Sequence, residues 1–294
     1  MKSPVELAVA HMRESYSEPL SLVDIAKSAM LSRFHFSRVF RDATGVSPGR
    51  FLSAIRIYEA KRMLASTSLT VTDISLAVGY NSLGSFTNRF TESVGLSPSR
   101  FRRVWQSGVR AVPAPLLPPA PPAPPSVPQG SVAGRVELPS RYAAARIWLG
   151  AFATPIIQGH PAASAILQAG PGQPASYRLT GIPAGEWHIR AVAMADSTDP
   201  EPWTSRSLLV AGQGSVTVTP GAVSPKVLTL RPRRLTDLPI LFAVPDLELA
   251  GAWDEHMRDL TRPAPEPATT GPAAAPRLPW RGPASVAWTD CRRA

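Results

Sequence analysis

The sequence contains one cysteine, five histidines and no long apolar run. A single cysteine, Cys291, excludes an intrachain disulfide and favours a reducing compartment. The histidines show no metal-ligand spacing with one another or with Cys291, and no glycine-rich loop stands between a strand and a helix, where it could hold phosphate. The longest apolar stretches, such as residues 240–244, are far shorter than the roughly twenty residues that span a bilayer. We therefore expect a protein that is not an enzyme, uses no cofactor or metal, and has no membrane partner.

The first twenty residues also lack the apolar core and the cleavage pattern of a signal peptide. Together with the single cysteine, this predicts a cytoplasmic protein. Cys291 stands beside Arg292 and Arg293, so a methyl-accepting or redox role for its thiol is kept as a minor alternative.

Positive charge and proline are in excess. The 294 residues carry a net charge of +10, and residues 1–110 hold +7 of it, from 15 Lys and Arg against 8 Asp and Glu. This balance favours a polyanionic partner. Nine of the seventeen residues from 112 to 128 are proline, which predicts a semi-rigid polyproline-II spacer, with a PxxP ligand for another protein as the alternative. Residues 262–294 are rich in Pro and Ala, which predicts disorder.

The first hundred residues contain an internal repeat. Residues 20–25, Leu-Ser-Leu-Val-Asp-Ile, return at 69–74 as Leu-Thr-Val-Thr-Asp-Ile, and residues 40–51 return at 90–101. The offset is 49 at the start and 50 at the end. Each copy is typical of two short helices separated by a tight turn. Two such units on a basic chain predict a protein that reads two neighbouring stretches of DNA.

Cap signals predict where the helices begin. Ser21 and Thr70 each stand three residues before an aspartate, as in a capping box. Ser47 followed by Pro48 predicts a helix that runs to Ser66. Its length of roughly 28 Å is close to the rise of about 34 Å in one turn of B-DNA, so this helix could hold the two units one turn apart.

Two further helices are expected, over residues 4–16 and from Pro98 to near Trp105. In the first of these and in the helix after Ser21, the side chains expected to face inward are Val5, Leu7, Ala8, Met12, Leu22, Ile25, Ala26 and Ala29.

The second helix of the first copy, residues 32–44, combines an aromatic and several arginines on its outer face. Its inward stripe is expected at Phe36, Val39, Phe40 and Ala43. A major-groove helix explains the outer residues, because Arg38 could hydrogen-bond guanine, Phe34 could pack on thymine methyls and Ser37 could contact base or phosphate. Arg33 and Arg41 suit phosphate contacts. The alternative is a solvated charged face with one stray aromatic.

The corresponding helix of the second copy has no cation on its outer face. Its inward stripe is expected at Phe86, Phe90 and Val94, and its outer face at Gly84, Thr87, Asn88 and Thr91. Asn88 could bind adenine, and Thr87 could contact a methyl group or a phosphate. Further candidates, as caps, base contacts or phosphate contacts, are Asn81, Ser82, Leu83, Gly84 and Arg89. We expect an asymmetric reader in which the first helix supplies most specificity; a second unit that is mainly structural or clamps phosphate is the alternative.

Residues 1–105 resemble the DNA-binding domain of the AraC/XylS family of transcriptional regulators. The matching motifs are Leu20-Ser-Leu-x-Asp-Ile-Ala26, Ser37-Arg-x-Phe40, Gly45-x-Ser-Pro48, Arg56-x-x-x-Ala60, Gly79-Tyr-x-Ser82, Phe86-x-x-x-Phe90 and Gly95-x-Ser-Pro98-x-x-Phe-Arg102. The resemblance implies seven helices with two helix-turn-helix motifs, of which helices 32–43 and 82–93 enter successive major grooves. The sequence departs from the family at Asn88 and Thr91, where a basic residue is usual, and in having its extra domain after the DNA-binding domain.

After the proline-rich stretch the apolar period shortens to two. Alternating runs occur at 131–138, 145–151, 176–179, 187–193, 207–210, 215–219 and 227–230. Glycine and proline separate them, which predicts a small β-sandwich, with a further edge element at 238–249. The pattern Tyr-x-Leu-x-Gly-Ile-Pro-x-Gly-x-Trp-x-Ile-x-Ala at 177–191 resembles carboxypeptidase regulatory-like, transthyretin-like sandwiches. Trp148, Trp187 and Trp203 either form a sugar-stacking surface or belong to the core.

The expected fold is therefore multidomain: an all-α double helix-turn-helix domain over 1–108, a proline-rich linker over 109–129, a small all-β sandwich over 130–250 and a disordered tail over 251–294. The expected function is sequence-specific transcriptional regulation. Double-stranded DNA is the expected partner, RNA polymerase is a candidate, and a small molecule or protein is a candidate ligand of the sandwich. The alternative is an interaction or scaffolding protein whose helices bind DNA nonspecifically.

Overall fold

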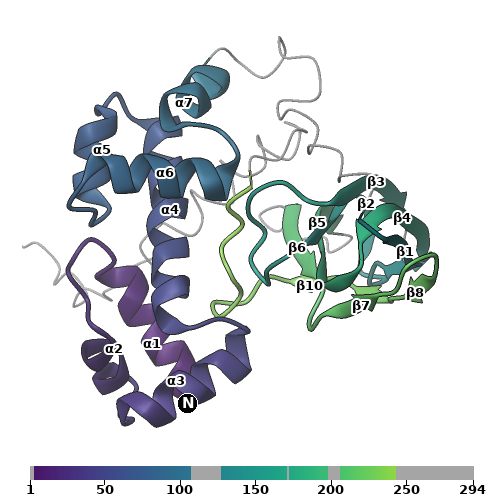
Figure 1. Cartoon of the computed structure of the whole chain (residues 1–294), viewed down its shortest axis with the longest axis horizontal. Coiled ribbons are helices and arrows are strands. Elements are labelled where there is room, and N and C mark those ends of the chain that lie inside the picture. Colours follow the sequence, from purple (N-terminus) through teal and green to yellow (C-terminus); the bar gives the residue numbers. More distant parts are fainter. Residues whose placement is uncertain (1–2, 107–126, 171, 198–205, 243–294) are drawn as a thin grey trace, which may run out of the picture.

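The computed structural model describes residues 3–106, 127–170, 172–197 and 206–242. Within these ranges the helices precede all the strands, and the two groups lie on opposite sides of the molecule (Figure 1). The helices are α1 (Pro4–Glu14), α2 (Leu22–Ser28), α3 (Arg33–Thr44), α4 (Pro48–Ser66), α5 (Val71–Ala77), α6 (Leu83–Val94) and α7 (Pro98–Gln106). No helix in the described part is long and apolar enough to cross a membrane.

The predicted helix starts are confirmed. The hydroxyl of Ser21 accepts the backbone N–H of Asp24, and the Asp24 carboxylate accepts the N–H of Ser21. Thr70 and Asp73 repeat this reciprocal pair at the start of α5. The helix predicted from Pro48 to Ser66 is observed with these bounds.

Three expectations about inward-facing side chains are wrong. Leu7 is half-buried, and Val9 takes its place in the core. Leu22 is 41% exposed, because it occupies the first turn of a helix of only seven residues and only Ile25 and Ala26 within that helix are buried. Ala43 is exposed, although Phe36 and Phe40 on the same helix are buried. The first helix also ends at Glu14, two residues earlier than expected.

Most of helix α4 beyond its first turn is buried, and its buried residues are spread round the helix. Its buried residues are Pro48, Phe51, Leu52, Ala54, Ile55, Ile57, Tyr58, Ala60, Lys61 and Leu64. A helix with apolar residues all round needs cover from more than one direction. The helix α1 and the helices of the two copies cover part of α4, and later residues such as Ile156 and Ile240 cover another part.

Two arginines hold the turns in front of the helix-turn-helix motifs. Arg56 on α4 donates to the carbonyl oxygens of Tyr16 and Glu18, at 2.8 and 2.7 Å, just before α2. Arg102 on α7 donates to the carbonyl oxygen of Leu69, just before α5. Gly79, with a φ of +83°, packs against the turn before α2 that Arg56 holds, and a Cβ there would lie 2.8 Å from the backbone oxygen of Ser17. Glycine is therefore required at this position.

The part of the chain over residues 127–170, 172–197 and 206–242, which we term the strand region, contains two sheets. Its strands are β1 (Gln129–Glu137), β2 (Tyr142–Phe152), β3 (Ala163–Ala169), β4 (Ala175–Pro183), β5 (Gly185–Ser197), β6 (Arg206–Ala211), β7 (Val216–Val218), β8 (Val223–Pro225), β9 (Leu228–Thr229) and β10 (Arg231–Pro232). In the described residues, one sheet has the order β4-β1-β8, with β9 also paired to β1. The other has the order β10-β6-β5-β2-β3, with β7 also paired to β5.

Every alternating run predicted as a strand overlaps an observed one, but β3, β8 and β10 were not predicted. The edge element expected at 238–249 is wrong as far as the structure describes it, because residues 238–242 form no strand. Positions 243–249 lie outside the described residues, as do Trp203, most of the proline-rich linker and the expected tail. Trp148 and Trp187 belong to two different cores, so these two do not share a sugar-stacking surface.

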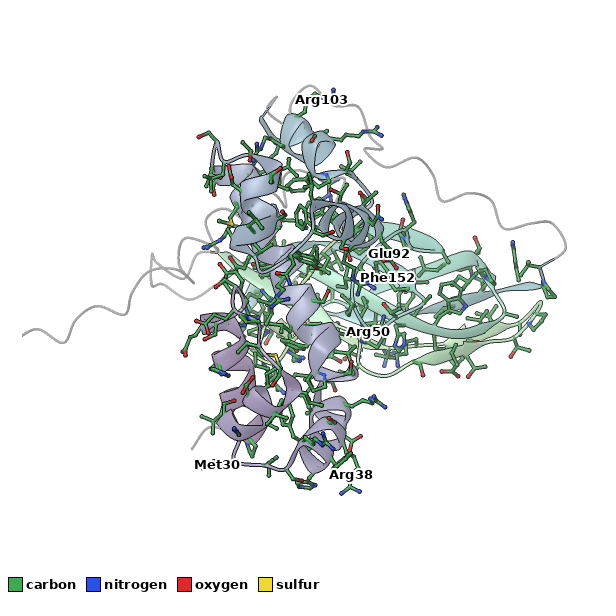
Figure 2. All side chains as sticks on the ribbon, turned by 60° about the vertical axis from the view of Figure 1, so that its left-hand side comes forward. Met30, Arg38, Arg50, Glu92, Arg103 and Phe152 are labelled. Carbon is green, nitrogen blue, oxygen red and sulfur yellow. The ribbon has the colours of Figure 1, made fainter. Side chains whose placement is uncertain are left out.

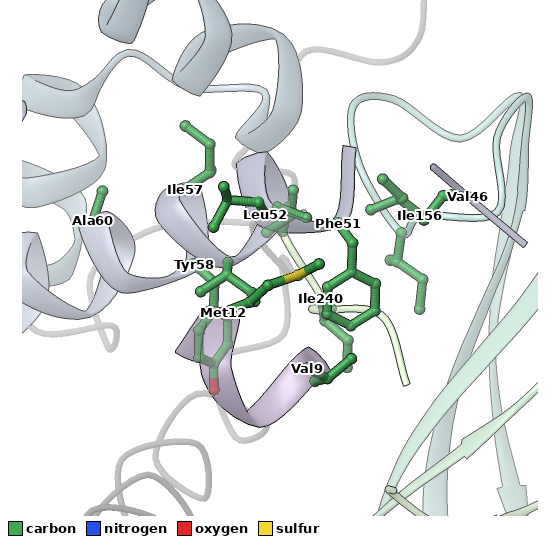
Figure 3. Close-up of a cluster of buried hydrophobic side chains, with 14 of the residues drawn as sticks. Val9, Met12, Val46, Phe51, Leu52, Ile57, Tyr58, Ala60, Ile156 and Ile240 are labelled. Carbon is green, nitrogen blue, oxygen red and sulfur yellow. The ribbon is translucent and has the colours of Figure 1, made fainter. Parts of the chain in front are cut away.

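Both faces of the larger sheet are covered. Odd-numbered residues such as Ile147, Ile189 and Leu209 belong to the cluster between the two sheets. Even-numbered neighbours such as Trp148, Val192 and Leu208 belong to the cluster that includes the helical core. Since successive side chains of a strand point to opposite faces, the helices and the strand region share one continuous core. Figure 3 shows Ile156 and Ile240 of the strand region among residues from α1 and α4.

Candidate nucleic-acid interface

Aromatic packing fixes the rotation of α3. Phe36 and Phe40 are fully buried, with ring centroids 5.3 Å apart, and Phe40 meets Phe51 of α4 edge-on at 5.4 Å. Ser32 precedes the helix in an extended conformation, and Gly45 ends it with a φ of +80°. With one face locked in the core, the opposite face of α3 points to solvent.

That outer face carries the residues predicted for the first copy. Phe34 is 75% exposed, and Arg33, Arg38 and Arg41 are also exposed. Arg38 projects from the far end of the helical part, away from the strands (Figure 2). The guanidinium of Arg33 lies 4.6 Å from the centre of the Phe34 ring, so these two side chains form a cation–π pair.

Ser37 is the least accessible of the first-copy candidates. It is half-buried, and its hydroxyl donates a hydrogen bond of 2.8 Å to the carbonyl oxygen of Arg33. The donor is therefore used within the helix, while the oxygen can still accept a hydrogen bond.

The second copy is packed in the same way. Phe86 and Phe90 of α6 are fully buried, and their rings contact Tyr80 and Phe101 at centroid distances of 5.4 and 5.8 Å. On the outer side, the exposed candidates are Asn81, Ser82, Leu83, Gly84 and Asn88. Thr87 is half-buried. The Ser82 hydroxyl accepts the N–H of Ser85 at 3.1 Å, so this side chain caps the helix.

Arg89 differs from the other candidates. It is half-buried, and its Nε donates to the Ser53 hydroxyl of α4 at 3.3 Å. Its Nη1 lies 3.1 Å from the Glu92 carboxylate. The guanidinium therefore contacts α4 and its own helix, whereas the predicted first-copy arginines point outward.

The two copies consequently present different chemistry. The outer side of α3 offers cations and an aromatic ring, whereas α6 offers amide, hydroxyl and small side chains. The structure brings the candidates together as two separate groups, one toward each end of α4 (Figure 1).

Some exposed arginines of the helical part were not among the sequence candidates, and two of them are related by the repeat. Arg50 and Arg100 occupy equivalent places in the first turns of α4 and α7, and each backbone N–H lies 3.4 Å from the hydroxyl of a preceding serine, Ser47 or Ser97. The repeat itself carries the signal, since both copies read Ser-Pro-x-Arg-Phe. Exposed arginines at such places suit phosphate contacts.

No group of three or more His, Cys, Asp or Glu side chains with metal-binding geometry occurs in the described ranges. Cys291 lies outside them. The described site thus consists of side chains able to donate and accept hydrogen bonds and to pack on bases.

The match to a known family falls on the helical part. Residues 25–104 match the family described as helix-turn-helix domain. The N-terminal region of this chain is therefore an AraC-type helix-turn-helix domain, as its motifs predicted.

Two relatives illustrate the extent of the similarity. The lactose operon transcription activator of Staphylococcus xylosus is 34% identical over 98 residues, which cover 33% of this chain and 35% of that protein. The HTH-type transcriptional activator AarP of Providencia stuartii is 41% identical over 83 residues, which cover 28% of this chain and 62% of AarP. The chain thus spans about a third of the first relative and under two thirds of the second.

Among solved structures, the DNA-binding domain of AdpA in complex with a target DNA aligns with a TM-score of 0.35 at 27% identity. The alignment covers 36% of this chain and 96% of that domain.

Proposed function

We propose that this chain is a DNA-binding transcriptional regulator that reads a specific sequence by placing α3 and α6 in successive major grooves. The observation that carries the proposal is the outer face of α3, where an exposed aromatic and three arginines stand on a helix whose other face is locked in a core. The relatives of this region are named transcription activators, which supports the same function. We infer that the chain has no enzymatic activity.

In the first copy, Arg38 hydrogen-bonds a guanine, Phe34 packs on thymine methyl groups, and Ser37 accepts a hydrogen bond from a base. Arg33 and Arg41 neutralise phosphates and fix the register of the helix on the duplex. A side chain paired by cation–π contact to its neighbour, as Arg33 is to Phe34, is already ordered before DNA arrives.

In the second copy, Asn88 pairs with adenine, while Thr87 and Leu83 make methyl and apolar contacts. Asn81, Ser82 and Gly84 lie at the start of α6, close to where a phosphate backbone would pass. Arg89 reaches a phosphate only by releasing Glu92. Specificity therefore comes mainly from α3, and α6 adds affinity and a second, weaker preference.

The rest of the proposal concerns the organisation of the chain. We infer a helical DNA-binding domain over 1–108, a linker over 109–129, a sandwich related to the carboxypeptidase regulatory-like group over 130–250, and a tail over 251–294. Two sheets around one shared core support the sandwich. RNA polymerase is the candidate protein partner in the cytoplasm, and the sandwich is the candidate ligand-binding part.

The test is a selection of bound duplexes from a random pool with the full chain, followed by titration of the selected duplex at rising salt. We expect a motif with two half-sites about one helical turn apart, and a preference over random DNA that persists at moderate salt. The same selection with Arg38→Ala should lose preference at one base pair. If no motif is enriched and all binding disappears with salt, the helices bind phosphates only, and the chain is better described as an interaction protein.

A further inference from the structure

The strand region touches both helix-turn-helix copies at matching places. Residues 153–162, between β2 and β3, form what we term the bridging loop. In the first copy, the loop packs on the end of α3, where a Cβ at Gly45 would lie 3.5 Å from Pro155 and where Val46 and Ile156 share one buried cluster (Figure 3). In the second copy, the Gly159 N–H donates to the carbonyl oxygen of Ser93, near the end of α6, at 2.7 Å.

The bridging loop is hydrogen-bonded to β5 and to the segment that follows the last strand. Arg190 of β5 donates through Nε to the carbonyl oxygen of Pro155 at 3.0 Å. The backbone N–H groups of Leu241 and Phe242 both donate to the carbonyl oxygen of Ile157, at 2.9 and 3.0 Å. The loop is therefore tied to the sheet and to a segment that follows the last strand.

That segment, residues 238–242, is in turn tied to α4. The ammonium of Lys61, which is buried, donates to the carbonyl oxygens of Leu241 and Phe242 at 2.8 and 3.1 Å, and lies 3.5 Å from that of Ile240. The Phe242 ring stacks on Trp148 at 5.2 Å. A buried nitrogen that donates to two or more carbonyl oxygens is a directional tie between α4 and this segment.

We propose that the bridging loop and residues 238–242 form a brace that holds the two helix-turn-helix copies at one separation and orientation, so that the strand region sets the spacing between the two DNA half-sites. This inference rests on the proposed function. The two copies are joined through α4, and a single helix can bend. A second connection between the copies, through the bridging loop, restricts this bending. Lys61 and Arg190 act as positioning residues, because both lie on the brace and not on the outer faces of α3 and α6.

The experiment uses the full chain and a series of duplexes that carry the two selected half-sites with spacers changed by single base pairs. The wild-type protein should lose about tenfold in affinity for each base pair added or removed, a penalty similar to that of a mismatch. Lys61→Met and Arg190→Met should keep the affinity for a single half-site and lose only about two- to threefold per base pair of altered spacing. Lys226→Met removes the same charge beside the four-stranded sheet, where the ammonium donates to Gln213, and should behave like wild type.

Spin labels on Asp42→Cys of α3 and Thr91→Cys of α6, in a Cys291→Ser background, give a readout without DNA. The distance distribution between the labels should be narrow in wild type and broader in both brace variants. The brace would be overturned if Arg190→Met left both the spacing preference and the distribution of label distances unchanged. This outcome decides the matter even if Lys61→Met fails to fold. Absence of any sequence preference in the wild-type protein would instead refute the proposed function and leave the label distances as the test of the brace.

Discussion

Replacing Phe242 with alanine gives the sharpest test of the shared core. The Phe242 side chain is buried, its ring stacks on Trp148 at 5.2 Å, and it meets Phe152 edge-on at 6.3 Å. It belongs to the cluster that contains the cores of the helices. Phe242→Ala should therefore weaken the contact between helices and strands as well as local packing.

The expected cost is about 3–5 kcal/mol in the free energy of unfolding, the usual range for removing a phenylalanine from a packed core. Phe34→Ala is the matched control, because it deletes the same atoms from a side chain that is 75% exposed. A surface substitution of this kind should change stability by at most about 0.5 kcal/mol.

Equilibrium unfolding in urea measures both variants. Because the chain has seven tryptophans, both variants are made in a background in which the other six are replaced by phenylalanine. Fluorescence then follows Trp148 of β2, and far-ultraviolet circular dichroism follows the helices. In Phe242→Ala the two probes should separate, with the strand-region signal lost at lower urea, whereas in Phe34→Ala they should stay together. A difference of less than about 1 kcal/mol between the variants would refute the packing of residue 242 between the two parts.

Other predictions concern binding, pH and backbone. Arg38→Ala should cost about 1–3 kcal/mol of DNA-binding free energy and relax one base preference, while Asn88→Ala should cost less, as measured by titration of the selected duplex; a larger loss at Asn88 would reverse the ranking of the two helices. Burial lowers the pKa of Lys61 to about 7, so between about pH 7 and 10.5 the unfolded chain binds more protons than the folded one, and the free energy of unfolding should rise with pH, by up to about 1.4 kcal/mol per unit. Lys61→Met should remove this rise in urea titrations across that range, and an equal slope in both proteins would contradict it. Gly79→Ala should destabilise by about 1–2 kcal/mol or more because of its positive φ, whereas Gly49→Ala in the first turn of α4, where a Cβ meets nothing within 4 Å, should be neutral or stabilising by about 0.5–1 kcal/mol in thermal unfolding.

The helical part was largely predictable because its signals are local. A capping box such as Ser21 with Asp24, or a serine followed by proline at the start of α4, defines a helix end within four residues. The internal repeat doubled each such signal, so that the outer faces of α3 and α6 could be found without knowledge of any contact. The errors fell where local pattern gives too little information, as at Leu22, which is apolar but lies in the first turn of a very short helix.

The shared core was not predicted, because its partners are far apart in the sequence. Residues 145–151 and 187–193 were interpreted as alternating strands with one buried face, although Trp148 and Val192 are apolar residues on the other face. That near-continuous apolar character is typical of a sheet covered on both sides. The same holds for α4, whose apolar residues on all sides already indicated more cover than its own domain supplies. Which segment supplies that cover could not be read from pattern alone.

The bond between Lys61 and residue 241 joins positions 180 residues apart, and this separation has a consequence for synthesis. The ribosome releases α7 about 136 residues before Phe242, the last residue of the brace that the structure describes. At about 5–20 residues per second, the complete set of helices waits roughly 7–27 s before the remaining apolar side of α4 is covered. During that interval the nascent helices are a substrate for chaperones, and a chain that terminates before residue 238 never closes this surface.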